Sequence, residues 1–444
     1  DITEEKLGIR SLKVITAPDK YGESFYFELN GKPLFAKGAN YIPCDNFLPR
    51  VTDSIYDKTI RDAVAANMEA MKANLPASTS MIGVVKTDGY GHGAVPVART
   101  IDPYVDGYAV ASVDEGIILR RHGIRKMVLV LGVTHESRFE DLVRYDIRPA
   151  MFRYGEAQKL SAVAAAMGKR ANIHLAVDTG MNRIGMKPDQ ESADMVLRIS
   201  MLEGIRIEGM FTHFARADEA DKTTYGLQFG KYSDFVEMLG SRGINIPIRH
   251  CSNSAGIVES LGSNGLDMVR AGISIYGLYP SDEVGKDAVK LAPAMELKSF
   301  ITYIKTIGPG DAVSYGGTFV ADRQMRVATI PVGYGDGYPR SLSGRGSVLI
   351  RGQRARILGR ICMDQFMVDV TGIVDAAEDD EVTLIGRDGD GFISVEELAG
   401  TGGGFHYEII CGIGKRVPRV YIRDGRVIGK KDYFNDIYEG FGYM

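Results

Sequence analysis

Apolar runs of strand length alternate with amphipathic runs of helix length between residues 62 and 291. Segments such as VDEGIILRRHG and GEAQKLSAVAAAMGKR carry apolar residues at helical spacing, and shorter apolar runs lie between such segments. The strand candidates are residues 81–85, 107–111, 127–131, 147–152, 173–177, 207–214, 248–252 and 268–272. Eight strand–helix units over about 230 residues are typical of a (β/α)8 barrel of the TIM type. A doubly wound open sheet needs fewer strands and a different early glycine fingerprint, so the pattern favours the barrel.

The pattern changes after residue 291. The segments ITYIKTI, MRVATIPVG, SVLIRGQRARILGRI, FMVDVTG and EVTLIG are β-rich, are separated by glycine turns and show little helical periodicity. We therefore expect a mostly β domain over residues 292–444. Residues 1–61 match neither half, so the predicted organisation is an N-terminal segment of foreign origin (1–61), a barrel (62–291) and a β domain (292–444).

Composition narrows the possible partners. The chain has 53 Lys plus Arg and 57 Asp plus Glu, and its net charge of −4 indicates neither a nucleic acid nor an anionic membrane. The longest apolar runs, such as MVLVLGV, are too short to span a bilayer. The four cysteines are scattered without a CxxC pair, which fits a reducing compartment. The charged start DITEEKLGIR shows no signal peptide. We expect a cytoplasmic protein.

Polar residues at the C-terminal ends of the predicted barrel strands are the candidates for catalysis, because the active sites of such barrels lie there. They are Lys86, Arg183, His213, Ser254 and Arg270. This set of an amine, two guanidiniums, an imidazole and a hydroxyl favours an anionic ligand. The remaining histidines show no ligand spacing, so we expect no metal. A lysine in such a place suits a Schiff base with an aldehyde cofactor, the commonest being pyridoxal 5'-phosphate.

Glycine-rich segments surround these candidates. In VVKTDGYGHG, residues 84–93, an apolar run that indicates a buried strand precedes Lys86, and DGYGHG indicates a loop. The segment is no phosphate-binding P-loop, because that motif places its glycines before the lysine. RAGISIYG offers backbone N–H groups next to Gly272 and Ile273 for a phosphate, with Ser254 and Tyr90 as hydroxyl donors.

Eight motifs in register resemble the alanine racemase family. They are VVKTDGYGHG, VDTGMNRIG, THFARADE, RAGISIYGLYP, SYGGTF, PVGYGDGYPR, GRICMDQFMVDV and YEIICGIGKRVPR, and they run in order from about residue 64 to residue 425. The resemblance covers both predicted domains. It implies a homodimeric isomerase that depends on pyridoxal phosphate, with active sites shared across the dimer interface.

The resemblance also implies a role for each matching residue. Lys86 would hold the cofactor and act as the base on one face, and Tyr315 in SYGGTF, contributed by the partner subunit, would be the base on the other. Arg270 would face the pyridine nitrogen, and His213 would link Arg270 to Tyr315. The phosphate would be held by Tyr90, Ser254, Gly272, Ile273 and Tyr407. The substrate pocket would be framed by Arg183, Met363, Asp364 and Tyr334.

Physical chemistry supports these assignments. A guanidinium has a pKa of about 12 or higher, so Arg270 would leave the pyridine nitrogen unprotonated and disfavour side reactions such as transamination. Racemisation removes a proton from one face and returns it to the other, so it needs two bases. A free tyrosine titrates near about 10, and Tyr315 therefore needs cationic neighbours such as the His213–Arg270 pair.

One position departs from the family pattern. Many members carry a carbamylated lysine just before VDTGM, whose negative charge braces the arginine that corresponds to Arg183. This chain has Ala176 there. We expect Arg183 to be braced by another group, or to bind substrate less firmly.

The first 67 residues carry a different resemblance. ESFYFELNGKPLFAKGANYIPCDNFLPR resembles the stretch that enters the barrel of family 2 glycosidases, β-mannosidases especially, and the likeness ends within TIRDAVAANM. The stretch lacks the paired carboxylates of glycoside hydrolysis, so we expect no glycosidase activity. It replaces the first strand with which alanine racemases begin, and FYFEL could substitute for that strand by pairing with the β domain.

The expected activity is interconversion of L- and D-alanine, supplying D-alanine for peptidoglycan in a bacterial cytoplasm. Two alternatives stay open, a racemase of serine or of a broader set of amino acids, and a cofactor-binding chimera without turnover. The segment GRDGDGFISVEEL, residues 386–398, resembles a calcium loop but has Gly386 at its first position and follows a strand. We expect a surface turn followed by a short helix there.

Overall fold

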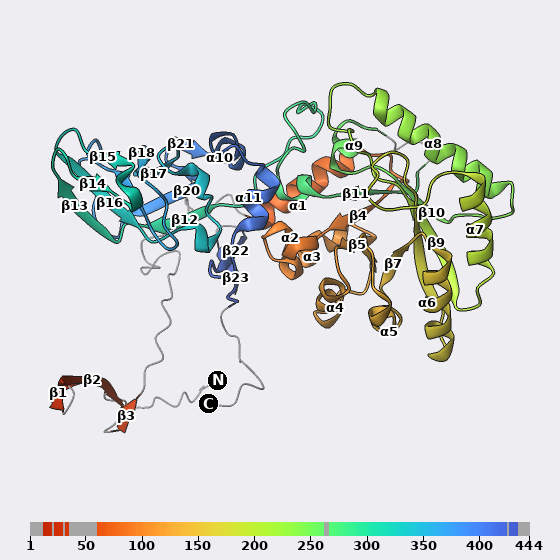
Figure 1. Cartoon of the computed structure of the whole chain (residues 1–444), viewed down its shortest axis with the longest axis horizontal. Coiled ribbons are helices and arrows are strands. Elements are labelled where there is room, and N and C mark those ends of the chain that lie inside the picture. Colours follow the sequence, from red (N-terminus) through yellow and green to blue (C-terminus); the bar gives the residue numbers. More distant parts are fainter. Residues whose placement is uncertain are drawn as a thin grey trace, which may run out of the picture. The chain divides into compact units, whose positions relative to one another are not determined.

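A computed structural model describes most of the chain (Figure 1). It describes residues 60–261, 266–423 and 426–433, together with the backbone of 12–19, 22–29 and 32–34. The chain divides into two compact units, residues 1–48 and 49–444. The second unit contains both predicted domains; the exact boundaries at 61/62 and 291/292 stay predictions.

Eight parallel strands close into a barrel, which confirms the fold predicted for the middle of the chain. Their order around the barrel is β10-β11-β4-β5-β6-β7-β8-β9. Their bounds are β4 Ser80–Val84, β5 Gly107–Val110, β6 Met127–Val130, β7 Arg148–Met151, β8 Ala171–Ala176, β9 Ile205–Phe211, β10 Ile248–His250 and β11 Met268–Ala271. All four residues of β5 are buried, as expected for strands that are covered on both faces and therefore read as continuous apolar runs.

Helix α1 precedes the first barrel strand, and the other helices connect successive strands, as Figure 1 shows around the barrel. They are α1 Ile60–Ala73, α2 Lys86–Tyr90, α3 Ala94–Ile101, α4 Val113–Arg121, α5 Phe139–Arg144, α6 Tyr154–Ala166, α7 Gln190–Ser200, α8 Thr223–Gly240 and α9 Ser254–Val258. Several begin at a side chain that accepts a hydrogen bond from the first turn, such as Ser112 at α4, Asp189 at α7 and Asn253 at α9.

Strands β8 and β9 are joined with a β-bulge in the barrel wall. Ile173 lies opposite Ile207, and the next residue, His174, lies opposite Gly209. Glu208 is therefore an extra residue on β9 without a partner on β8. A bulge of this kind changes the face to which the following side chains point.

The C-terminal part is mostly β, as predicted. Seven strands form one sheet in the order β12-β20-β17-β18-β19-β16-β13, and β21 pairs with β20. They are β12 Leu297–Phe300, β13 Tyr303–Ile307, β16 Met325–Ile330, β17 Ser347–Ile350, β18 Gln353–Leu358, β19 Phe366–Asp369, β20 Glu381–Asp388 and β21 Gly391–Ile393. The C-terminal part also contains two two-stranded sheets, β14 Ala312–Val313 with β15 Phe319–Val320, and β22 Arg419–Arg423 with β23 Arg426–Lys431.

The calcium-like segment forms a hairpin and a helix. Strands β20 and β21 pair across a tight turn, and α10 Val395–Gly402 begins directly afterwards; α11 His406–Gly412 follows. The expected turn before a short helix is confirmed. No group of metal-ligating side chains was found among the described residues.

The first unit contains a three-stranded sheet, β1 Leu12–Asp19, β2 Gly22–Leu29 and β3 Lys32–Leu34. The segment FYFEL lies in β2, which pairs with β1 on one side and β3 on the other. The pairing of FYFEL with the β domain stays a prediction. The side chains behind the glycosidase resemblance lie outside the described residues. Within the described part of the chain, no helix is long and apolar enough to cross a membrane.

Candidate active site

Lys86 stands at the C-terminal mouth of the barrel, directly after β4. The backbone there makes a tight turn rather than an open loop, because Thr87, Asp88, Gly89 and Tyr90 all have φ between 50° and 64°. This left-handed conformation costs free energy for residues other than glycine, so contacts with other groups must stabilise it. The Glu115 carboxylate accepts hydrogen bonds from the N–H groups of Thr87 (2.6 Å) and Ala111 (2.7 Å). Sequence analysis did not identify Glu115.

The Lys86 amine lies in a largely enclosed, cationic environment. Burial lowers the pKa of Lys86, and the positive charges of Arg183 and Arg270 lower it further, against the opposing effects of Cys411 and Glu115. The same fields reach His213, where burial and the charges of Arg270, Arg183 and Lys86 lower the imidazole pKa to about 3. His213 is therefore neutral at physiological pH. These couplings place four predicted residues, from three different strand ends and one loop, around a common centre.

Arg270 is buried in the barrel wall on β11. Its Nη1 donates to the backbone carbonyl of His250 and lies 2.8 Å from His250 Nδ1. Its Nη2 donates to the carbonyls of Thr212 and Cys251 and lies 3.2 Å from His213 Nδ1. Burial lowers the pKa of Arg270 to about 10, so it remains a cation at neutral pH. Among the described residues, no acceptor is found for Nε, the one guanidinium N–H that remains.

A set of hydroxyl and backbone N–H groups gathers next to Gly272. Ser254 Oγ accepts hydrogen bonds from the N–H of Gly272 (2.9 Å) and of Ser274 (3.3 Å). A side chain at position 272 would bring a Cβ within 3.2 Å of Tyr90 Oη and 3.5 Å of Ser254 Oγ. The Ser274 hydroxyl is buried and has no partner among the described residues. Small, polar surroundings of this kind suit a phosphate, and Ile273 begins the short 3-10 turn that supplies the N–H groups.

The C-terminal part of the chain contributes to the same site. Helix α11 places the ring of Tyr407 6.3 Å from the ring of Tyr90. Arg419 donates to Gly91 O (2.9 Å), and Tyr421 Oη donates to His92 O (3.0 Å). These contacts fix the turn after Lys86 from the outside. Sequence analysis predicted Tyr407 but missed Arg419 and Tyr421. Their neighbours in the sequence are apolar or basic and gave no indication that these two residues contact the site.

Four predicted residues lie in the C-terminal part of the chain and form a second group. Tyr315, Tyr334 and Met363 have large exposed fractions of 70%, 43% and 53%. Gly335 N donates to Met363 O, and Asp364 pairs with Arg416 at 2.7 Å. Within the described residues, no hydrogen bond, ion pair or ring contact joins Tyr315 or Asp364 to Lys86 or Arg270. The contribution of these four residues to the site of Lys86 stays a prediction.

Arg183 is exposed, in the segment after β8, and its charge acts on Lys86 and His213. Ala176 ends β8 and is buried. Within the described residues, the Arg183 guanidinium makes no hydrogen bond or ion pair with another side chain or carbonyl. The brace that we expected for Arg183 is thus not found within the described part of the chain.

The residues present fit the phosphate and the aldehyde of a pyridoxal phosphate. The fit rests on the unpartnered Ser274 hydroxyl, on the space beside Gly272 that a Cβ would fill, and on an amine of lowered pKa at the same barrel mouth.

Comparisons with known proteins agree with this geometry. The family models for the N-terminal and C-terminal domains of alanine racemase match residues 60–280 and 294–421. An alanine racemase of Desulforamulus reducens is 44% identical over 364 residues, which cover 80% of this chain and 97% of that protein. The solved alanine racemase of Clostridium difficile 630 is 40% identical with a TM-score of 0.80, covering 84% of this chain and 97% of its own. A histidine racemase of Leuconostoc mesenteroides is 28% identical with a TM-score of 0.74, covering 80% and 94%.

Proposed function

The chain belongs to the alanine racemase family and is an amino-acid racemase, and from this premise we propose that it holds pyridoxal phosphate at Lys86 and interconverts L- and D-alanine between two bases. The observation that carries the proposal is the position of the Lys86 amine. This amine shares the barrel mouth with the polar groups at Gly272 and Ser254 that suit a phosphate, and with the buried cation of Arg270. When bound, pyridoxal phosphate supplies an aldehyde that condenses with an amine and a ring that withdraws electrons from the substrate α-carbon.

Each residue then has a separate task. Tyr90, Ser254, Tyr407 and the N–H groups at Gly272 and Ile273 would hold the phosphate. Arg270 would donate Nε–H to the pyridine nitrogen. Because its pKa is about 10, Arg270 keeps its proton at neutral pH and leaves that nitrogen unprotonated.

Two bases would act on opposite faces of the α-carbon. The Lys86 amine, whose pKa is lowered by burial and by Arg183, would accept and return the proton on one face. The partner subunit's Tyr315 would do so on the other, which agrees with the exposure of Tyr315 in a single chain. Arg183 would receive the substrate carboxylate, while Met363, Asp364 and Tyr334 of the second group would frame the pocket.

Mixing two inactive variants tests the shared site. Lys86→Ala and Tyr315→Phe should each lower kcat by at least about 100-fold, the usual contribution of one acid–base group. If the sites are shared in a homodimer, subunits mixed and exchanged at equal amounts should recover about a quarter of the activity, since half of the dimers are mixed and one of their two sites is intact. The exposed Tyr303→Phe is the matched tyrosine control. No recovery, from variants shown to form mixed dimers, would contradict the shared site.

A second candidate substrate follows from the comparison with the histidine racemase. The ratio of kcat/KM for alanine, serine and histidine decides between a narrow and a broad racemase. A value for alanine at least tenfold above the other two would support the proposal, and equal values would favour a broad racemase. Supply of D-alanine for peptidoglycan and a cytoplasmic location belong to the same proposal.

A further inference from the structure

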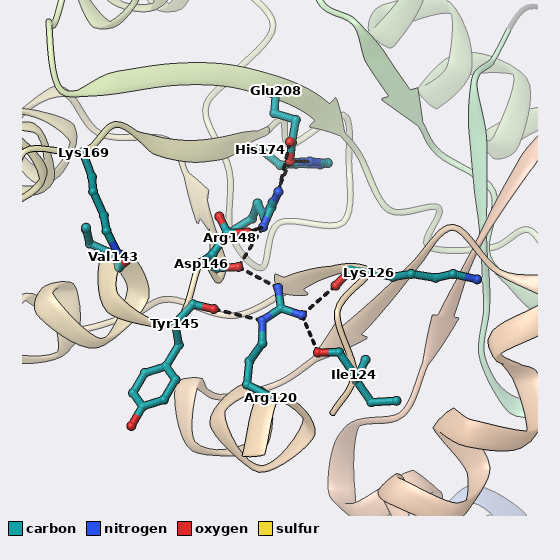
Figure 2. Close-up of polar contacts among 10 residues, drawn as sticks. All are labelled: Arg120, Ile124, Lys126, Val143, Tyr145, Asp146, Arg148, Lys169, His174 and Glu208. Carbon is teal, nitrogen blue, oxygen red and sulfur yellow. Dashed lines mark hydrogen bonds and ion pairs between the residues drawn. The ribbon is translucent and has the colours of Figure 1, made fainter. Parts of the chain in front are cut away.

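A line of polar side chains crosses the barrel interior beneath Arg270. His250 Nδ1 lies 2.8 Å from Arg270 Nη1, and His250 Nε2 lies 2.9 Å from Nδ1 of His174. His174 Nε2 lies 3.3 Å from the Glu208 carboxylate, which also accepts a hydrogen bond of 2.8 Å from Arg148 Nε. Figure 2 shows Arg148 between Asp146 and Glu208, with the Glu208 carboxylate beside His174. Both histidines are fully buried, so this line needs an explanation in a barrel core that is mostly apolar.

The chemistry of the two ends determines every proton between them. Arg270 can only donate, so His250 Nδ1 must accept and its proton must sit on Nε2. His174 Nδ1 must then accept from His250, which leaves the His174 proton on Nε2, facing Glu208. A carboxylate can only accept, and therefore the assignment closes without a conflict. One tautomer of each histidine satisfies all three contacts.

Local geometry aims Glu208 into this line. Glu208 is the extra residue of the bulge between β8 and β9, and the bulge determines the face to which its side chain points. The following residue, Gly209, leaves room for the imidazole, because a Cβ there would lie 2.6 Å from Cε1 and Nδ1 of His174. The two features together place carboxylate and ring in contact.

The charges of these groups are consistent with the same tautomers. Burial tends to raise the pKa of Glu208, but hydrogen bonds from His174 and Arg148 outweigh it and lower the pKa to about 2. Burial lowers the pKa of His174, and burial together with the charge of Arg270 lowers that of His250 well below its usual value. At neutral pH the line is a carboxylate, two neutral imidazoles and a guanidinium.

We propose that Glu208 is a positioning residue that sets the tautomers of His174 and His250 and thereby orients Arg270 toward the cofactor. We call Glu208, His174, His250 and Arg270 the relay. Within it, His250 Nδ1 presents its lone pair to Arg270 Nη1. With its two Nη atoms held by protein acceptors, the guanidinium can offer only Nε–H to a ligand. This inference rests on the proposed contact between Arg270 and the pyridine nitrogen.

Nitrogen NMR of the unmodified enzyme tests the relay directly. In holoenzyme labelled with 15N-histidine, solid-state spectra distinguish Nδ1–H, Nε2–H and doubly protonated rings, and His174→Gln and His250→Gln assign the signals. We expect both His174 and His250 to be neutral with the proton on Nε2. A proton on Nδ1 of either ring, or a charged ring, would overturn the proposal, whatever the behaviour of any variant at position 208.

Glu208→Leu tests the effect on the cofactor. Arg148 Nε and His174 Nε2 both donate to the same oxygen, Glu208 Oε2, so an amide oxygen in that place would still accept both bonds, and only an apolar side chain removes the acceptor. Without this acceptor the buried His174 Nε2–H has no partner, and the other tautomer, with the proton on Nδ1, becomes available to that ring. The reversal passes to His250 and sets two donors against each other at Arg270 Nη1. We expect the His174 and His250 signals to change tautomer, the absorption maximum of the bound pyridoxal phosphate to shift, and kcat to fall by about 10- to 100-fold, as for other groups that orient a ligand-contacting residue.

The matched control is Asp146→Asn. Asp146 pairs with the same Arg148 at 2.7 Å but is 66% exposed and does not touch His174. It should leave tautomers, spectrum and kcat unchanged. A Glu208→Leu enzyme with the unmodified enzyme's spectrum and kcat would overturn the proposal, and equal losses in both variants would reduce it to a general effect of Arg148. Activity that survives in Lys86→Ala would instead refute the proposed function, and this outcome is independent of the histidine tautomers.

Discussion

Substituting Gly209 by alanine tests how tightly the barrel wall holds the relay. The added Cβ would lie 2.6 Å from Cε1 and Nδ1 of His174 and 2.9 Å from Ile248 O. The ring would have to withdraw by about 1 Å to reach van der Waals distance. A shift of this size is enough to break the 2.9 Å hydrogen bond between His174 Nδ1 and His250 Nε2.

The expected magnitude is a balance of two effects. Gly209 is not among the glycines of positive φ, so alanine adds no backbone strain. It raises the free energy of unfolding by about 0.4–1 kcal/mol, because it restricts the conformations of the unfolded chain. Overpacking of a rigid interior costs about 1–3 kcal/mol. We expect a net loss of about 1–2 kcal/mol in the free energy of unfolding, and a kcat about tenfold lower because Arg270 loses its orientation.

Urea unfolding of the cofactor-saturated enzyme, with kcat measured on the same samples, checks both numbers. The matched control is Gly226→Ala in α8, where a Cβ would meet nothing within 4 Å. It should raise stability by up to about 1 kcal/mol and leave kcat unchanged. If Gly209→Ala behaves like Gly226→Ala in both measurements, the close packing of His174 against β9 is wrong.

Three further outcomes follow from the site. The pKa of Glu208 is lowered from 4.5 to about 2, so its contribution to stability is complete above pH 4.5 and is lost as the pH falls toward 2; urea unfolding should show the advantage over Glu208→Gln shrinking across that interval. Ser254→Ala should raise the Kd for pyridoxal phosphate by about tenfold in a fluorescence titration, because the phosphate loses the Ser254 hydroxyl as a donor and the N–H groups of Gly272 and Ser274 lose the oxygen that orients them. Arg419→Met should lower the midpoint of urea unfolding, with a loss of about 2 kcal/mol or more in the free energy of unfolding, because it leaves buried carbonyls such as Gly91 O without a donor.

The barrel was predictable because its strands are short, apolar and evenly spaced. The predicted strand at 127–131 and the observed β6, Met127–Val130, differ by a single residue. The rule that catalytic residues follow the C-terminal ends of barrel strands also identified Lys86, His213 and Arg270. These three residues lie close enough that the charges of Arg270 and Lys86 lower the pKa of His213. These predictions depend on local periodicity and on a general property of parallel barrels, both of which a single sequence contains.

The relay could not be predicted, because a bulge changes the register that periodicity assumes. In IRIEGMF, Glu208 reads as a solvent-facing residue of an alternating strand, and its neighbour Gly209 reads as a weak point. Only the pairing of His174 with Gly209 shows that the carboxylate turns toward the ring. Glu115 was missed for a similar reason, since its role is to hold the left-handed turn after Lys86, and that turn was predicted as a loop.

The separation between Glu208 and Arg270 has a chemical consequence of its own. A carboxylate bound directly to the guanidinium would neutralise its charge and could occupy Nε–H, the donor that the cofactor needs. Two neutral imidazoles transmit the orientation of the hydrogen bonds while the negative charge stays beside Arg148. Arg270 therefore keeps a net positive charge at the site, which also lowers the pKa of Lys86 and His213. An enzyme that replaced His250 by a carboxylate would lose this field, so we expect the pKa of its catalytic lysine to rise.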